Sequence, residues 1–191
     1  MNRRWLIEAA IAVAVLQIAF LASLIAGRAT ILRHGEVVTL EVRPVDPRDL
    51  LRGDYVILSY NISSLPVDLF EERPQGEQGE RAAVQVRLRA GEDGIWQAVA
   101  ARYGGAPLAP KEQGDVDIAG TASASWTDQM SHVVVSYGIE RFYVPEGEGR
   151  AIETDLRERP FRMQIAVAPD GAAQIKSFHD GDRPLYVEPL Y

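Results

Sequence analysis

RGDYVILSY, residues 52–60, decides how the main body of the chain is expected to fold. Gly53 can adopt a tight backbone conformation and Asp54 can hydrogen-bond nearby backbone amides, so the stretch begins with a turn. The six residues that start at Tyr55 are rich in the aromatic and β-branched side chains typical of strands. Successive side chains alternate between two faces, and here both faces are largely apolar. The pattern therefore predicts a central strand that is covered on both sides, or one whose tyrosines form a rim.

The chain on both sides of this stretch alternates between strand patterns and turn signals. EVVTLEVR, residues 36–43, alternates apolar and polar side chains and predicts a half-buried strand. Pro169-Asp170-Gly171 is the clearest hairpin signal in the chain. Further strands are expected at residues 83–89, 95–103, 115–122, 132–144, 161–167, 172–177 and 183–188. We therefore expect a mainly β (β-rich α+β) domain of about eight to ten antiparallel strands.

Two segments of this domain have other patterns. Residues 65–79 hold two prolines and two glycines among charged residues, which is typical of a surface loop. Residues 149–159 place Ile152 and Leu156 four positions apart, and Pro160 follows. This spacing predicts one short helix that ends before the proline.

An apolar run at the N-terminus, LIEAAIAVAVLQIAFLASLIAG, precedes the strand patterns and covers residues 6–27. Glu8 and Gln17 are its strongly polar members, and its 22 residues exceed the about 20 that span a bilayer as a helix. A cleaved signal peptide has a shorter apolar region of about 7–15 residues, and the end of this run, LIAGR (residues 24–28), is a poor match to a cleavage site, which leaves Gly27-Arg28-Ala29 as the alternative site. A core helix would show one polar face. The run therefore favours a transmembrane anchor.

The anchor divides the chain into a short cytoplasmic N-terminus, a membrane helix, a linker and a folded domain. Their expected bounds are residues 1–5, 6–27, 28–35 and 36–191. Arg3, Arg4 and the amino group favour a cytoplasmic N-terminus, whereas Arg28, Arg33 and Arg43 oppose it. Because a long domain crosses the membrane largely regardless of its charge, we expect residues 36–191 outside the cytoplasm.

Composition and motif content exclude several kinds of chemistry. There is no cysteine, so disulfides, thiol nucleophiles and cysteine-ligated metals are ruled out. The net charge of -7 and the lack of a basic, aromatic-rich patch argue against nucleic-acid binding. Neither a P-loop nor a zinc-type spacing occurs. Residues 179–182 (HDGD), the pair Asp115 and Asp117, and the isolated His34 and His132 are explained more simply as turn or surface residues. We expect no metal and no cofactor.

Two further readings of the opening stretch are weak. Arg52-Gly53-Asp54 spells an adhesion tripeptide, but adhesion requires a protruding loop and this tripeptide runs directly into a strand. Residues 47–56 (PRDLLRGDYV) look like the entry to a signal-peptidase-type active site, where a serine precedes the proline. Here Pro44, Val45 and Asp46 stand before Pro47, and none of them is a nucleophile.

Residues 53–60 also spell GDYxxLxY without a mismatch. In this the chain resembles the GDYXXLXY family of bacterial membrane-anchored proteins. Residues 137–149 (YGIERFYVPEGEG), followed by Ala151-Ile152-Glu153, are similar to a second stretch of that family, and the N-terminal anchor fits as well. The resemblance implies a single-pass protein of the bacterial inner membrane with a periplasmic domain, and a multi-pass membrane protein as partner. It implies no particular reaction.

The two motifs supply the candidate site residues. The candidate binding residues are Asp54, Tyr55, Tyr60, Glu140, Arg141, Tyr143 and Glu146. The candidate structural residues are Gly53, Leu58, Gly138, Pro145 and Gly149. A pairing of Asp54 with Arg141 is a further hypothesis. The expected function is a non-catalytic binding or scaffolding module that works with a membrane or envelope partner. The alternative is a small envelope hydrolase that uses the carboxylates near Glu146 and Glu153.

Overall fold

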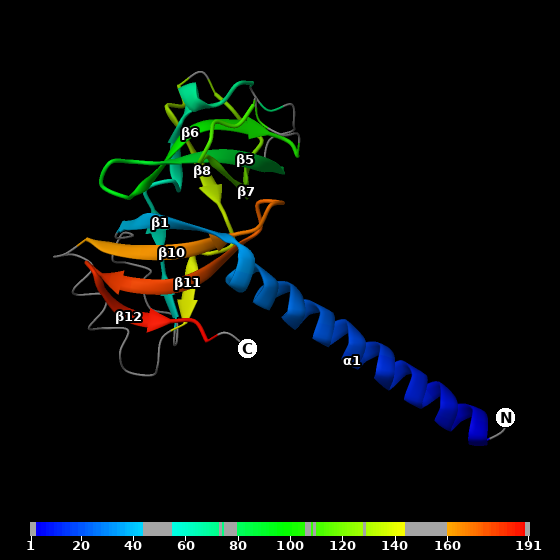
Figure 1. The fold of residues 1–191 in the computed structure, drawn as a ribbon. Helices are drawn as coiled ribbons and strands as arrows, with labels where there is room; N and C mark the ends of the chain where they lie inside the picture. Colours follow the sequence, from blue (N-terminus) through cyan, green and yellow to red (C-terminus); the bar gives the residue numbers. More distant parts are fainter. Residues whose placement is uncertain are drawn as a thin grey trace.

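The computed structural model describes residues 3–43, 55–72, 74, 80–105, 108, 110–127, 129–143 and 160–189. One long N-terminal helix, α1 (Arg3–His34), leads into a body of antiparallel β-sheets (Figure 1). The mainly β fold behind a single apolar helix was predicted from the sequence and is confirmed. The short helix expected at residues 149–159 lies outside the described residues.

The first sheet has the strand order β12-β11-β10-β1-β3. Its members are β1 (Glu36–Arg43), β3 (Ser59–Tyr60), β10 (Phe161–Val167), β11 (Ala173–Asp180) and β12 (Arg183–Val187). β1 buries Val38, Leu40 and Val42 and turns the side chains between them outward, as its alternating sequence predicted. β10 pairs with β1 along nearly its full length, so these two strands form the centre of the sheet.

The second sheet has the order β4-β8-β7-β5-β6. Its members are β4 (Ser64–Pro66), β5 (Arg81–Ala90), β6 (Trp96–Tyr103), β7 (Val116–Ser123) and β8 (His132–Ser136). A short 3₁₀ helix, η1 (Val67–Leu69), follows β4. The prediction that residues 65–79 form only a surface loop is therefore wrong at its start. Leu65 and Phe70 are buried in the hydrophobic core, and this burial holds residues 65–70 against it.

A third, two-stranded sheet joins β2 (Tyr55–Ile57) to β9 (Arg141–Tyr143). The prediction of one central strand over residues 55–60 is wrong, because the chain changes partner in the middle of the stretch. It pairs with β9 up to Ile57 and with β1 from Ser59, and between them the Leu58 N–H donates to the Glu140 carbonyl at 2.8 Å.

The expected strand over residues 132–144 is likewise divided. Gly138 lies between β8 and β9 with a φ of +79°, a left-handed conformation that interrupts a strand. These two interruptions, together with β4, explain why the described residues form twelve strands where about eight to ten were expected.

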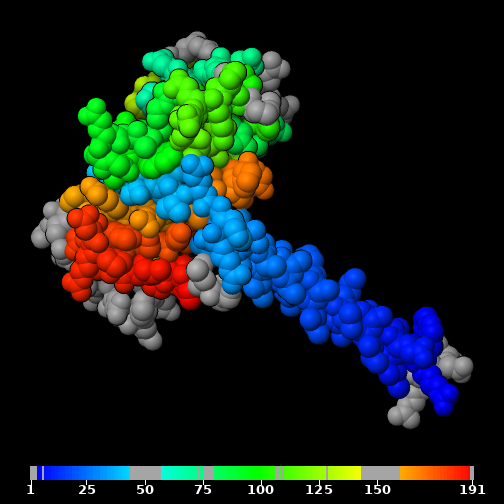
Figure 2. Space-filling model, in the orientation of Figure 1, coloured from blue at the N-terminus to red at the C-terminus, as the bar shows by residue number. Residues whose placement is uncertain are grey.

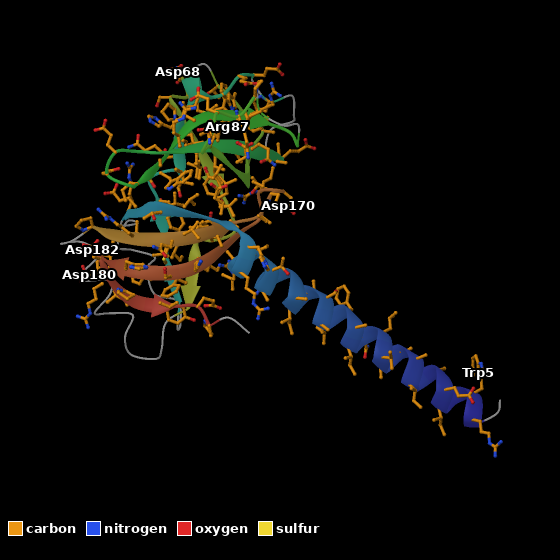
Figure 3. The ribbon with its side chains drawn as sticks, viewed as in Figure 1. Trp5, Asp68, Arg87, Asp170, Asp180 and Asp182 are labelled. Atoms are coloured by element: carbon orange, nitrogen blue, oxygen red, sulfur yellow. The ribbon has the colours of Figure 1, made fainter. Side chains whose placement is uncertain are left out.

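The two five-stranded sheets meet at the tip of the β10–β11 hairpin, which the sequence predicted at Pro169-Asp170-Gly171. Asp170 caps the turn by accepting a hydrogen bond from the Ala172 N–H at 3.0 Å. The Gly171 carbonyl accepts a hydrogen bond from the Ala119 N–H of β7 at 2.9 Å. A Cβ at Gly171 would lie 2.7 Å from that nitrogen, so glycine permits the close approach. Figure 3 shows Asp170 at this contact beside the second sheet.

α1 does not end where its apolar run ends. It continues through residues 28–34, which were expected to form a linker, because Ala29 and Leu32 are buried where the helix packs on β10 and β11. The helix stops at Gly35, whose N–H donates to the Ile31 carbonyl at 2.8 Å. A Cβ there would meet the same oxygen at 2.5 Å. The helix thus enters the first sheet without a flexible break and projects from the body as a rod (Figure 2).

Candidate binding site at the helix–sheet junction

Two buried tyrosines lock the two sequence motifs together. The Tyr60 hydroxyl donates a hydrogen bond to the Ile139 carbonyl at 2.6 Å, and the Tyr137 hydroxyl donates one to the Ile62 carbonyl at 2.7 Å. Each tyrosine lies two residues before the carbonyl that the other uses, so the arrangement is reciprocal. We call these four residues the tyrosine clamp. It joins the end of the GDYxxLxY motif to the start of the second motif.

Glu140 shapes the turn that carries one half of the clamp. Its carboxylate accepts hydrogen bonds from the N–H groups of Tyr137 and Gly138, the latter at 3.0 Å. Its carbonyl accepts the Leu58 N–H. Glu140 was predicted as a binding residue, but its carboxylate and its main-chain carbonyl both accept hydrogen bonds from within the protein. Leu58 is buried beside the clamp.

The clamp hydroxyls stay protonated. Burial raises the pKa of Tyr60 well above its usual range, and the nearby Glu140 carboxylate adds to the effect. Burial and Glu140 raise the pKa of Tyr137 in the same way. Tyr60 is only 1% exposed, so a ligand outside the protein does not reach it. The structure gives Tyr60, a candidate binding residue, a place in the core, because its motif crosses between two sheets.

A pocket of about 510 Å³ lies beside the clamp, where α1 meets the first sheet, and we call it the junction pocket. It is lined by Arg28, Gly138, Ile139, Arg141, Phe142, Gln174, Ile175, Tyr186 and Glu188. The second motif, the end of the apolar helix, and strands β11 and β12 all contribute to it. Its volume lies within the range of about 300–1,000 Å³ that is common for small-ligand sites.

The junction pocket combines an aromatic wall with a charged rim. Phe142 packs against Phe178 and Tyr186, with ring centroids 5.4 and 5.2 Å apart, and this packing fixes the wall. Arg28 and Arg141 are exposed at the rim. The Glu188 carboxylate accepts a hydrogen bond from the Tyr186 hydroxyl at 2.7 Å. Two guanidinium groups above apolar side chains suit a ligand with both an anionic group and an apolar part.

The structure brings the two motifs together, as far as its described residues extend. Tyr55 pairs with Tyr143 along the β2–β9 ladder, and Arg141 reaches the junction pocket. The remaining predicted residues, Gly53, Asp54, Pro145, Glu146, Gly149 and Glu153, lie outside the described residues. The hypothesis that Asp54 pairs with Arg141 therefore stays a prediction.

Three residues of this region were missed by reasoning from the sequence. Tyr137 heads the second motif, and its position at a strand end next to a glycine was an available signal. Arg28 follows the apolar run directly, which marks it as a residue at the membrane boundary. Tyr186 lies in a short edge strand and carries no local signal of its role.

The acidic pair Asp115 and Asp117, considered above as metal ligands, is held by arginines. Arg87 binds Asp117 through two hydrogen bonds of 2.8 and 3.1 Å, and Arg89 binds Asp115 through two of 2.8 and 3.0 Å. The hydrogen bond from Arg89 lowers the pKa of Asp115, and the hydrogen bond to Asp117 raises the pKa of Arg87. These contacts tie β5 to β7. In the described part of the chain, no group of three metal-ligating side chains occurs.

The cluster at residues 179–182 forms the tight turn between β11 and β12, as expected, with a φ of +59° at Gly181. Asp180 and Asp182 lie at the end of the first sheet that is remote from α1 (Figure 3). His179 contacts Ser177 at 2.7 Å, a serine–histidine contact. However, Ser177 is only 3% exposed and its hydroxyl donates to Gln164, so it is not presented to a substrate.

A sequence model of the GDYXXLXY protein family matches residues 17–178, from the middle of α1 to β11. The chain therefore belongs to the GDYXXLXY family. Comparison with curated proteins and with solved structures finds no match.

Proposed function

We propose that this member of the GDYXXLXY family is a non-catalytic binding or scaffolding module, tethered to the bacterial inner membrane by α1 and working with a multi-pass membrane protein. Its β-domain lies on the periplasmic side. The observation that carries the proposal is the position of the junction pocket. It lies where a rigid membrane helix joins the sheet, so whatever it binds is met at the bilayer surface.

The helix itself supports anchoring. Side chains along the apolar run are exposed, Leu16 by 71% and Ile18 by 67%, which is the pattern of a lipid-facing rod and not of a core helix. The Ser23 and Thr30 hydroxyls donate to carbonyls of the same helix at 2.7 and 2.8 Å, so they need no water.

The junction also argues against removal of the helix as a signal peptide. The weak cleavage candidate, Gly27-Arg28-Ala29, is helical, and Ala29 is buried against the first sheet. Cleavage would require this segment to leave the helix and to lose its packing. These contacts support the proposal of an uncleaved anchor with a fixed domain.

Gln17 supplies the contact that we assign to a membrane-protein partner. It lies in the middle of the apolar run and is exposed. A primary amide at the centre of a bilayer is costly unless it hydrogen-bonds across a helix interface. Glu8 lies nearer the end of the run, where its carboxylate can reach the interface. Gln17 is therefore the residue expected to face a second transmembrane helix.

Site-specific photocrosslinking in native membranes tests this function. A photoreactive residue at position 17 is expected to capture one multi-pass membrane protein. The same residue at Val15, about 160° around the helix, is expected to capture lipid only. Gln17→Leu is expected to reduce the size of the native complex and leave the folded domain unchanged. Equal capture from both positions, or an unchanged complex in Gln17→Leu, would contradict a partner on this face.

A further inference from the structure

The depth of the junction pocket relative to the bilayer follows from the length of the apolar run in α1. The apolar run of 22 residues is about 33 Å long at 1.5 Å per residue, close to the roughly 30 Å of hydrocarbon in a bilayer. Arg28, the next residue, then lies at the level of the lipid phosphates on the side of the domain. Because Arg28 also lines the junction pocket, the pocket opens at headgroup depth.

The pocket cannot easily move away from that depth. Ala29 and Leu32 are buried where α1 packs on the first sheet, and Gly35 is the single residue between the end of α1 and the start of β1. Arg141 is held by the β9 strand and by the packing of its neighbour Phe142. Two arginines from distant parts of the sequence are thus presented together at the membrane surface.

The chemistry of the lining selects among ligands found at that depth. Guanidinium groups bind phosphate oxygens in a bidentate manner and are weakly hydrated, which favours binding at an interface. Ile175 and Tyr186, which are only partly buried, offer apolar surface to a glycerol backbone and the first carbons of an acyl chain. Gln174 and the Glu188 carboxylate can accept hydrogen bonds from hydroxyl groups of a headgroup.

We propose that the junction pocket binds the phosphodiester of an anionic phospholipid with a hydroxyl-bearing headgroup, through Arg28 and Arg141. The proposal rests on the proposed function to the extent that α1 spans the membrane. The lipid proposal adds that the domain binds one class of lipid selectively in the leaflet next to it. A bound lipid would brace the helix–sheet junction from the membrane side.

Native mass spectrometry of the full-length chain in detergent micelles tests this directly, with phosphatidylglycerol and phosphatidylcholine as the probes. We expect retention of phosphatidylglycerol over phosphatidylcholine. Arg28→Gln and Arg141→Gln are each expected to weaken phosphatidylglycerol retention about tenfold, as one lost charge-assisted contact would. Arg43→Gln is the matched control, since it removes an exposed arginine at the far end of β1 and is expected to have no effect.

Equal retention of the two lipids, or an equal loss in Arg43→Gln, would overturn the proposal. Inorganic phosphate is a separate arm of the experiment. If it displaces phosphatidylglycerol and depends on the same two arginines, the site takes soluble phosphate and the lipid assignment is wrong. The crosslinking experiment at Gln17 is independent of these outcomes. Loss of lipid selectivity with intact capture at position 17 would refute the lipid site and leave the proposed function standing.

Discussion

At the helix–sheet junction, two neutral tyrosine hydroxyls donate to main-chain carbonyls, whereas across the second sheet two charged arginines bind two aspartates. We call the latter pairs, Arg87 with Asp117 and Arg89 with Asp115, the arginine clamps. The tyrosine clamp is buried, and the arginine clamps are partly open to solvent. Neutral buried hydrogen bonds do not weaken with salt, whereas ion pairs weaken to the extent that they are exposed, and each arginine clamp has one buried and one partly exposed member. The hydrogen bonds at the helix–sheet junction are therefore expected to depend less on ionic strength than the ion pairs of the second sheet.

Under the proposed membrane anchoring, this contrast has a physical rationale in the position of the junction. A membrane surface concentrates ions and changes the local pH, so ion pairs placed there would vary in strength. The clamp instead uses groups that are uncharged over the physiological range. Arg28 and Arg141 are exposed at the rim of the junction pocket, whereas the hydrogen bonds of the clamp beneath them join hydroxyl groups to main-chain carbonyls.

The largest expected effect comes from breaking the tyrosine clamp. Tyr60→Phe and Tyr137→Phe each leave a buried carbonyl unsatisfied, which is expected to lower the free energy of unfolding by about 1–3 kcal/mol. Urea unfolding of the full-length protein in micelles measures this. Tyr103→Phe is the control, because its hydroxyl donates to the Ser123 carbonyl and accepts from the Trp126 indole N–H at a half-exposed site, where their loss should cost less. A Tyr60→Phe protein no less stable than Tyr103→Phe would refute the structural importance of the clamp.

Breaking the better-buried arginine clamp comes next. Arg87→Met leaves the Asp117 carboxylate, 19% exposed, without its bidentate partner. Lys111, 3.5 Å away, retains part of the compensation. We expect a loss of about 1–2 kcal/mol in the free energy of unfolding. A loss of similar size is expected for Arg89→Gln, because Arg89 is itself more exposed but its replacement leaves the Asp115 carboxylate, 2% exposed, without its bidentate partner. High salt should shrink the difference between wild type and these variants. If salt changed the stability loss of Tyr60→Phe as much as that of the arginine variants, the difference drawn between the two regions would be contradicted.

A smaller effect, which sharpens the comparison between the two regions, is the pH dependence of the free energy of unfolding. The lowered pKa of Asp115 stabilises the fold above the pKa of the unfolded carboxyl, about 3.9, and this contribution disappears as pH falls through the folded value. The raised pKa values of Tyr60 and Tyr137 act in the opposite direction. Their contribution is complete below the unfolded value of about 10 and is lost as pH rises above it.

Hydrogen exchange across a pH series measures both ends of this prediction. In acid, β5 and β7 should lose protection before the residues of the tyrosine clamp. In alkali, the clamp region should lose protection first. The same order of loss at both extremes would show that the two regions do not differ in the chemistry that holds them.

The local parts of this fold could be predicted from the sequence and the long-range parts could not. β1, β10 and the turn at Pro169-Asp170-Gly171 follow from alternation and turn residues that lie next to one another in the chain. The change of partner at Leu58 depends on a hydrogen bond to Glu140, far along the sequence, and no local pattern encodes it. Because the local sequence does not encode these long-range contacts, Tyr60 was predicted to bind a ligand, although the topology buries it.

The candidate site shows the same division. The second motif predicted Arg141 as a binding residue, whereas Arg28, which follows the apolar run, was not predicted to belong to the site. Their convergence in one pocket depends on α1 continuing as a helix to His34 and docking on the first sheet. That continuation had a local signal, since Ala29 and Leu32 are three residues apart and share a helix face, but their burial requires the sheet.

The central claim is that a rigid helix holds the junction pocket at the bilayer surface and the second sheet away from it. The chain has no cysteine, so one introduced cysteine can carry a spin label without a background signal. Labels at Gln174, on the pocket, and at Gln97, on β6, form a matched pair in full-length protein reconstituted into bilayers. Collisional accessibility to oxygen and to a water-soluble nickel chelate should place the Gln174 label among the headgroups and the Gln97 label in bulk water. Equal, water-like accessibility at both positions would contradict the account.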